Sequence, residues 1–132
     1  MKAAYIDTSL VIGIRFQKSP PATVRMVRRY ELFSSELLIA EVLAFGKRES
    51  MAEDLLWDAL KGLSWIIPDG SISEALRRVI HFGYARGANL WHLACACYLS
   101  PNPGELAFLT LDEQQRQLAS HLGFHAPRLA RS

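Results

Sequence analysis

Short apolar runs alternate with longer segments of helical periodicity along this chain. The short runs predict strands over 3–6, 31–34, 64–68 and 106–111, and a short edge strand over 123–125. The periodic segments predict helices over 10–14, 22–30, 36–47, 51–60, from 71 or 73 to 84, 90–99 and 112–122. Strands that alternate with helices are typical of a parallel sheet covered on both faces. The pattern therefore predicts a three-layer α/β/α fold with four to five strands.

The helical segments also predict which side chains face the core. The inward positions expected from the spacing are Val24 and Val27, then Leu55, Leu56, Ala59 and Leu60, and then Ile72, Leu76, Val79 and Ile80. The segments 36–47 and 90–99 are apolar almost all round, which predicts buried helices.

Length and composition indicate a single folded domain. The 132 residues are 50% hydrophobic, which is enough for one core over 1–132, with a loose polar tail expected from about Arg128. The formal net charge is only +2, but 11 of the 15 basic residues are arginine, the side chain suited to bidentate phosphate contacts. Solvated helix faces carry arginine too, so this bias alone does not indicate nucleic acid.

The cysteines and the hydropathy bear on the compartment. Cys95 and Cys97 are two positions apart in a predicted helix, so they point to different faces and are expected to be buried, reduced thiols. No signal peptide precedes the first strand, and no apolar run reaches the roughly 20 residues that a membrane span needs. We expect a soluble, cytoplasmic protein with no membrane contact.

Three carboxylates occupy positions where a core-building sequence would not place them. Asp7 and Asp112 each follow a predicted strand, and in a parallel sheet the ends of these strands share one edge, where ligands bind. Glu41 lies on a helix in one row with Leu37 and Phe45. Each has a simpler explanation: the two aspartates can be helix caps, and Glu41 can face solvent or pair with an arginine.

If the acids converge, their chemistry indicates a metal ion. Carboxylates gathered at one edge repel one another unless a cation is present, and hard divalent ions such as Mg²⁺ or Mn²⁺ prefer oxygen ligands. Such an ion lowers the pKa of a bound water and neutralises charge on a phosphodiester. The constellation therefore predicts phosphodiester hydrolysis.

Four motifs carry a resemblance to a known family. They are YIDTSLVI, SSELLIAEVLAF, GANLWHLACACYL and FLTLDEQQRQLASHLGF, and they span nearly the whole chain. In this order they resemble the PIN-domain ribonucleases, especially the VapC-type toxins of toxin–antitoxin pairs. The resemblance implies a PIN-like fold and a Mg²⁺- or Mn²⁺-dependent endoribonuclease that works as a homodimer, cleaves an RNA substrate and is inhibited by a cognate antitoxin. The family's acids fall on Asp7, Glu41 and Asp112, the last within a Thr-x-Asp motif that begins at Thr110.

The third motif departs from the family pattern. Asn89 stands where the family normally has an acidic ligand. Its amide oxygen can bind a metal or a metal-bound water but brings no charge, so weaker cation affinity is expected. Asn89 is also a good helix N-cap. Two functions stay open: an active nuclease in which Asn89 assists the three acids, and a PIN-fold RNA- or protein-binding module whose metal site is impaired.

Other polar residues are assigned supporting roles. Ser9 and Thr110 are expected to support the acids, Ser9 being equally explained as a helix-start hydroxyl, and His92 is expected to pack or to lie behind the ligands. The residues expected to contact RNA or an antitoxin are Arg25, Arg28, Arg29 and Arg86. A receiver domain would need adjacent acids after the first strand, and a haloacid-dehalogenase phosphatase usually has Asp-x-Asp where this chain has Asp7-Thr8-Ser9.

Overall fold

A computed structural model describes residues 1–131 and contains one parallel sheet. Its strands are β1 (Lys2–Ile6), β2 (Tyr30–Ser35), β3 (Ser64–Ile66) and β4 (Ala107–Leu109), in the order β3-β2-β1-β4. The helices are α1 (Thr8–Phe16), α2 (Pro21–Val27), α3 (Glu36–Arg48), α4 (Glu53–Ala59), α5 (Ser73–Phe82), α6 (Gly87–Leu99) and α7 (Glu113–Leu122), with a 3-10 turn at Pro103–Glu105. His125 adds an isolated parallel bridge to Ala107 in place of the predicted fifth strand.

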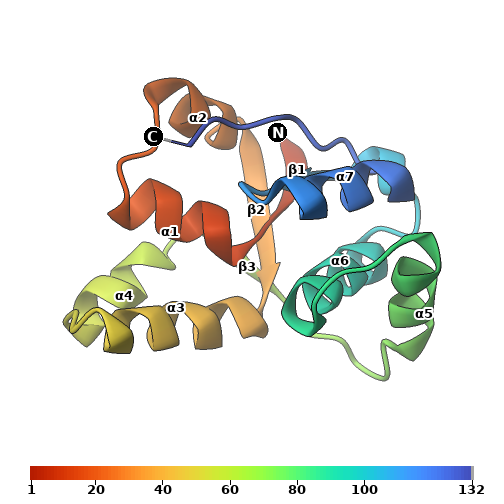
Figure 1. The fold of residues 1–132 in the computed structure, drawn as a ribbon, viewed down its shortest axis with the longest axis horizontal. Coiled ribbons are helices and arrows are strands. Elements are labelled where there is room, and N and C mark those ends of the chain that lie inside the picture. The colour runs from red at the N-terminus through yellow and green to blue at the C-terminus, as the bar shows by residue number, and fades with distance from the viewer. Residues whose placement is uncertain (132) are drawn as a thin grey trace.

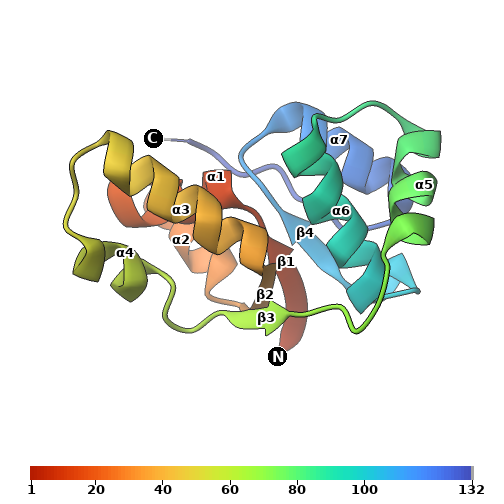
Figure 2. The same cartoon turned by 90° about the horizontal axis from the view of Figure 1, so that it is seen from below.

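Helices cover both faces of the sheet, which confirms the predicted three-layer α/β/α fold. Figures 1 and 2 show α1 to α4 on one side and α5 to α7 on the other. The side chains of β1 alternate between two apolar clusters: Tyr5 packs toward α5, α6 and α7, whereas Ala4 and Ile6 pack toward α1, α3 and α4. Phe108 stacks on Tyr5 within the first cluster, with ring centroids 5.3 Å apart.

The strand order reverses at β1, and this determines where a ligand can bind. The chain runs outward from β1 to β2 and β3, and then returns to place β4 on the other side of β1. Ala4 pairs with Leu32 on one side and with Ala107 on the other. In open parallel sheets, ligands bind outside the carboxyl ends of the strands at this switch point. Here these ends are Ile6 and Leu109, and Asp7 and Asp112 follow them closely.

Four predicted helix faces need correction. The helix expected over 22–30 is α2 and ends at Val27, because Tyr30 already belongs to β2, and its buried residues are Thr23 and Val27, with Val24 only half-buried. Leu55 is 56% exposed and Ile80 is 48% exposed, although both were expected to face inward. In each case the apolar stripe is wider than the face that the neighbouring elements cover. Likewise α3 is only partly covered, and its buried positions are Leu38, Val42 and Gly46.

Asn89 is not a helix N-cap, contrary to one of its two predicted roles. Helix α6 begins at Gly87 with Arg86 as its N-cap, and the backbone N–H of Leu90 donates to the carbonyl of Arg86 at 2.7 Å. Asn89 therefore lies in the first turn, so its side chain is not used in capping.

The polar tail is held against the domain instead of being loose. Leu129 packs against the cluster that contains α1 and α3, and the carbonyl of Ala130 accepts a hydrogen bond from Thr23 Oγ1 at 2.8 Å. The guanidinium of Arg131 donates to the carbonyl of Leu111 at 3.1 Å. The last residue, Ser132, lies outside the described residues.

The cysteines behave as predicted. Cys95 and Cys97 are both buried and form no disulfide. Burial raises the pKa of the Cys95 thiol to about 11, so the thiol stays protonated at neutral pH.

The hydropathy of the described helices bears on whether any of them could cross a membrane. Within residues 1–131, none of the helices combines the length and apolar character needed to cross a membrane.

Candidate active site

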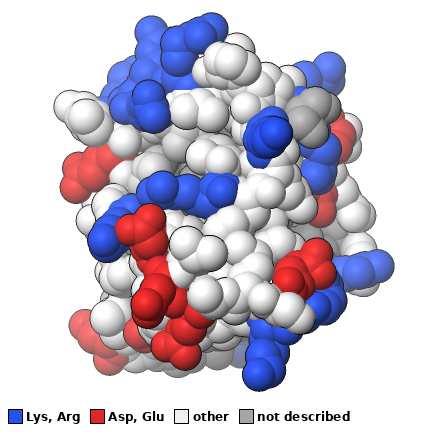
Figure 3. Space-filling view, turned by 90° about the vertical axis from the view of Figure 1, so that its left-hand side faces the viewer, with Lys and Arg blue, Asp and Glu red and all other residues white. Residues whose placement is uncertain are grey.

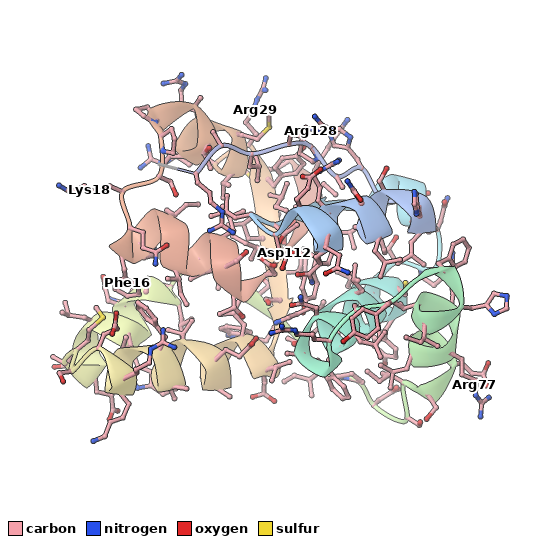
Figure 4. The ribbon with its side chains drawn as sticks, in the orientation of Figure 1. Phe16, Lys18, Arg29, Arg77, Asp112 and Arg128 are labelled. Atoms are coloured by element: carbon pink, nitrogen blue, oxygen red, sulfur yellow. The ribbon has the colours of Figure 1, made fainter. Side chains whose placement is uncertain are left out.

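A polar pocket lies at the switch point of the sheet. It has a volume of about 240 Å³ and is lined by Asp7, Thr8, Ser9, Ile12, Glu41, Asn89, His92, Asp112 and Gln115. All four residues predicted as metal ligands therefore line a single pocket, although they come from separate parts of the chain. Figure 4 labels Asp112 near the centre of the molecule, where α7 begins.

Asp7 is the most deeply buried acid of the pocket, with 3% of its surface exposed. Its Oδ1 accepts hydrogen bonds from Ser9 Oγ at 2.8 Å and from the backbone N–H of Leu10 at 3.2 Å, which makes Asp7 the N-cap of α1. Its Oδ2 accepts from Thr110 Oγ1 at 2.5 Å. Burial raises the pKa of Asp7 and outweighs these hydrogen bonds and the nearby His92, all of which lower it.

Thr110 connects the two strand-end acids. Besides donating to Asp7, its Oγ1 accepts the backbone N–H of Asp112 at 3.0 Å. Ser9 Oγ in turn accepts the backbone N–H of Leu111 at 3.2 Å. The two hydroxyls predicted to support the acids thus tie the end of β1 to the residues after β4. Asp112 is half-buried and caps α7 by accepting the backbone N–H of Gln115 at 3.0 Å.

Glu41 reaches the pocket from α3 and is held by two donors. Thr8 Oγ1 donates to its Oε1 at 2.7 Å, and His92 Nε2 lies 2.7 Å from the same oxygen. The side chain of Glu41 is 32% exposed. Partial burial opposes ionisation, but the hydrogen bonds from His92 and Thr8 outweigh it and lower the pKa of Glu41. The sequence left open that Glu41 pairs with an arginine, and its partner in the structure is His92.

Two amides complete the lining. The Nε2 of Gln115 donates to the backbone carbonyl of Asn89 at 3.4 Å, which links α7 to the first turn of α6. Gln115 is 1% exposed, and its Oε1 is the buried side-chain oxygen without a hydrogen-bond partner among residues 1–131. An unpaired buried acceptor costs about 1–3 kcal/mol, and a water or ligand donor in the pocket would relieve this cost.

The pocket offers oxygen ligands of the type that a hard divalent ion binds, but their side chains do not converge on one point. Three carboxylates and an amide are oxygen ligands of the type that Mg²⁺ or Mn²⁺ takes. Within residues 1–131, however, no three His, Cys, Asp or Glu side chains converge closely enough to hold an ion. Both oxygens of Asp7 already accept hydrogen bonds from the protein, so binding an ion there would require an exchange of bonds, whereas Oε2 of Glu41 takes part in neither of the two bonds of Glu41.

The predicted arginines divide between the two ends of the sheet. Arg25, Arg28 and Arg29, called the α2 arginines below, line a separate surface hollow on α2, which precedes the first residue of β2. They lie at the end of the sheet opposite to the pocket, as the positions of Arg29 and Asp112 in Figure 4 show. Figure 3 shows Lys and Arg gathered over this upper part of the molecule. Arg86 is exposed and is the N-cap residue of α6, three residues before Asn89, which lines the pocket.

Sequence reasoning missed two residues of the pocket. Neither Thr8 nor Gln115 was assigned a role in the site. Gln115 had a detectable signal, because it falls in one helical stripe with Leu118, Ala119 and Leu122, all of which are buried. A polar residue in such a stripe is the same signal that indicated Glu41.

Comparison with known proteins does not assign the chain to a family. No family model matches it, and no curated protein matches it significantly. The resemblance to PIN-domain ribonucleases therefore stays a prediction from the four motifs.

Proposed function

We propose that this protein is a Mg²⁺- or Mn²⁺-dependent endoribonuclease of PIN-like type that hydrolyses RNA phosphodiester bonds. The observation that carries the proposal is the pocket itself: Asp7, Glu41 and Asp112 line it together at the switch point of a parallel sheet. A structural role alone does not require three acids from distant parts of the chain to share one hollow.

Each acid has a distinct part in the proposed site. Asp7 and Asp112 would hold the ion from the sheet edge and Glu41 from α3, while Asn89 would offer a neutral oxygen to the ion or to its water. When bound, the ion supplies an activated water for in-line attack and neutralises charge on the scissile phosphate. Arg86 is exposed and three residues from Asn89, so it could meet a substrate phosphate.

The partners follow from the resemblance and belong to the same proposal. An RNA substrate, a cognate antitoxin and a homodimer are the partners of VapC-type toxins, and we propose them for this chain. The α2 arginines lie away from the pocket, so they would serve a protein contact instead of the cleavage site.

A second function is favoured by one specific observation. Asn89 replaces an acid, and the carboxylates among residues 1–131 do not converge on a common point. Both features suit a PIN-like RNA- or protein-binding module with an impaired metal site. The two functions differ in turnover, so a cleavage assay separates them.

The test is cleavage of a fluorescent single-stranded RNA with Mg²⁺, with Mn²⁺ and with EDTA. We expect cleavage only with a metal, and a loss of at least about a hundredfold in Asp112→Asn. A metal ion contributes several kcal/mol to the transition state, and about 1.4 kcal/mol corresponds to tenfold in rate. Asp54→Asn is the control, because Asp54 is an exposed acid of α4 outside the pocket. Equal cleavage by wild type and Asp112→Asn would reject the nuclease and leave the binding module.

A further inference from the structure

A chain of hydrogen bonds runs from the core to the pocket through His92. The hydroxyl of Tyr5 lies 2.5 Å from His92 Nδ1, to which it donates its hydrogen when Nδ1 carries none, and 3.2 Å from Ser35 Oγ. On the other side of the imidazole ring, Nε2 lies 2.7 Å from Glu41 Oε1. A carboxylate only accepts hydrogen bonds, so Nε2 carries the hydrogen of this contact. The chain joins β2, β1, α6 and α3.

The position of His92 is otherwise apolar. His92 is 1% exposed, and the four residues that follow it on α6 are buried hydrophobic residues. Burying a polar ring is unfavourable unless its nitrogens are hydrogen-bonded, and here both nitrogens have a partner. A leucine would fill this place without any partner. The polar ring is thus explained by its contact with Glu41 better than by packing.

The contact restrains the carboxylate of Glu41 in a particular way. Thr8 and His92 both bind Oε1, and neither bond involves Oε2. A glutamate that is free to move loses side-chain entropy when it is ordered. Since these two bonds order Glu41 before any ligand arrives, the second oxygen remains available to the pocket.

We propose that His92 is a positioning residue that preorganises Glu41 for a divalent ion. This inference rests on the proposed function, because it takes Glu41 as a ligand. His92 does not touch the ion or the RNA in this account, and it acts only through the carboxylate. Hydrogen-bond partners of metal ligands typically change metal affinity 10- to 100-fold when they are removed.

The test uses two amides that differ in reach. In His92→Gln the side-chain nitrogen can occupy the place of Nε2, whereas in His92→Asn the side chain is one methylene shorter and does not reach Glu41. Mn²⁺ affinity is measured by electron paramagnetic resonance, which counts free Mn²⁺ and does not depend on turnover. We expect affinity within about threefold of wild type for His92→Gln and a 10- to 100-fold loss for His92→Asn.

Controls separate this inference from the proposed function. Leu93→Val perturbs the next buried position of α6, outside the lining of the pocket, and should leave Mn²⁺ affinity unchanged. Glu41→Gln removes the charge of the proposed ligand itself, so it should weaken Mn²⁺ binding whether or not His92 positions Glu41. If wild type binds no Mn²⁺, the proposed function fails and this inference fails with it. If Glu41→Gln weakens binding but His92→Asn does not, only the role of His92 is rejected.

A second variant covers the case in which His92→Asn does not fold. His92→Leu fills the same apolar surroundings and cannot donate to Glu41, so it should show the same loss of affinity at temperatures well below its unfolding midpoint. Wild-type affinity in a folded His92→Leu protein, or equal affinity in the Gln and Asn variants, would overturn the assignment.

Discussion

Replacing Asp7 by asparagine should stabilise the protein while abolishing its proposed activity. Asp7 is almost fully buried, and burial raises the pKa of its carboxyl group, so the ionised form at neutral pH is held at a cost. Asparagine has nearly the same shape but carries no charge. We therefore expect Asp7→Asn to relieve that cost and to remove a metal ligand at the same time.

The hydrogen bonds of Asp7 can be retained by the amide. The oxygen of asparagine can accept from Ser9 and from the backbone N–H of Leu10, as Oδ1 does now. Its NH₂ group would face Thr110 Oγ1, which has two acceptor lone pairs and uses one for the backbone N–H of Asp112. The hydroxyl hydrogen of Thr110 can turn to Ser9 Oγ, 3.4 Å away. One amide hydrogen then binds Thr110, and the amide oxygen keeps both of its donors.

We expect the free energy of unfolding at pH 7 to rise by about 0.5–2 kcal/mol, the usual gain from relieving one unfavourable feature. For a chain of this length the gain corresponds to an increase of about 2–8 °C in Tm. The assay is thermal unfolding by circular dichroism without added metal. Asp112→Asn is the matched control, because Asp112 is also an N-cap but only half-buried, and its Tm should change less.

The dependence on pH gives the same prediction a second readout. Because the pKa of Asp7 is higher in the folded than in the unfolded protein, the folded protein retains a proton at pH values where the unfolded chain has released it. Stability from this group is present below its ordinary pKa and falls as pH rises toward the raised value. Asp7→Asn should lack this fall. A lower Tm in Asp7→Asn, or an unchanged pH dependence, would refute the reasoning.

Three further predictions concern the pocket, the basic surface and the tail. Asn89→Asp should strengthen Mn²⁺ binding by about tenfold in calorimetry, because it adds a charged ligand to the lining, and unchanged affinity would show that this side chain does not serve the ion. Replacing the α2 arginines by glutamine should leave RNA cleavage unchanged, whereas Arg86→Gln should slow it, and the reverse order would contradict the placement of the substrate. Leu129→Ala should lower the free energy of unfolding by about 1 kcal/mol in urea titration, since Leu129 is half-buried against the core. No change there would mean that the tail does not contribute to stability.

The arrangement of strands and helices was largely predictable because local signals agree with one another. Asp7 and Asp112 each follow an apolar run, and each caps the helix that comes next. The parallel sheet follows from the alternation of such runs with helices. What failed were the helix boundaries and faces: α6 begins before Asn89, and Leu55 and Ile80 face outward. These depend on which neighbours cover a stripe, and sequence periodicity contains no information about that.

The pocket was predictable only as far as residues follow strand ends or interrupt apolar rows. Asp7, Asp112 and Glu41 were found in this way, and all three line one pocket. The partners of these acids were harder to predict, because His92 is 51 residues from Glu41, and Thr110 is 103 residues from Asp7. Such contacts arise from tertiary packing.

The central claim is that side chains from the residue after β1, from α3 and from the segment after β4 bind one divalent ion. A crystal soaked in Mn²⁺ and measured at the manganese absorption edge tests it most directly. The account predicts one anomalous peak in the pocket, bonded to oxygens of Asp7, Glu41 and Asp112. Full occupancy of Mn²⁺ elsewhere on the protein, with no peak among these three carboxylates, would contradict it.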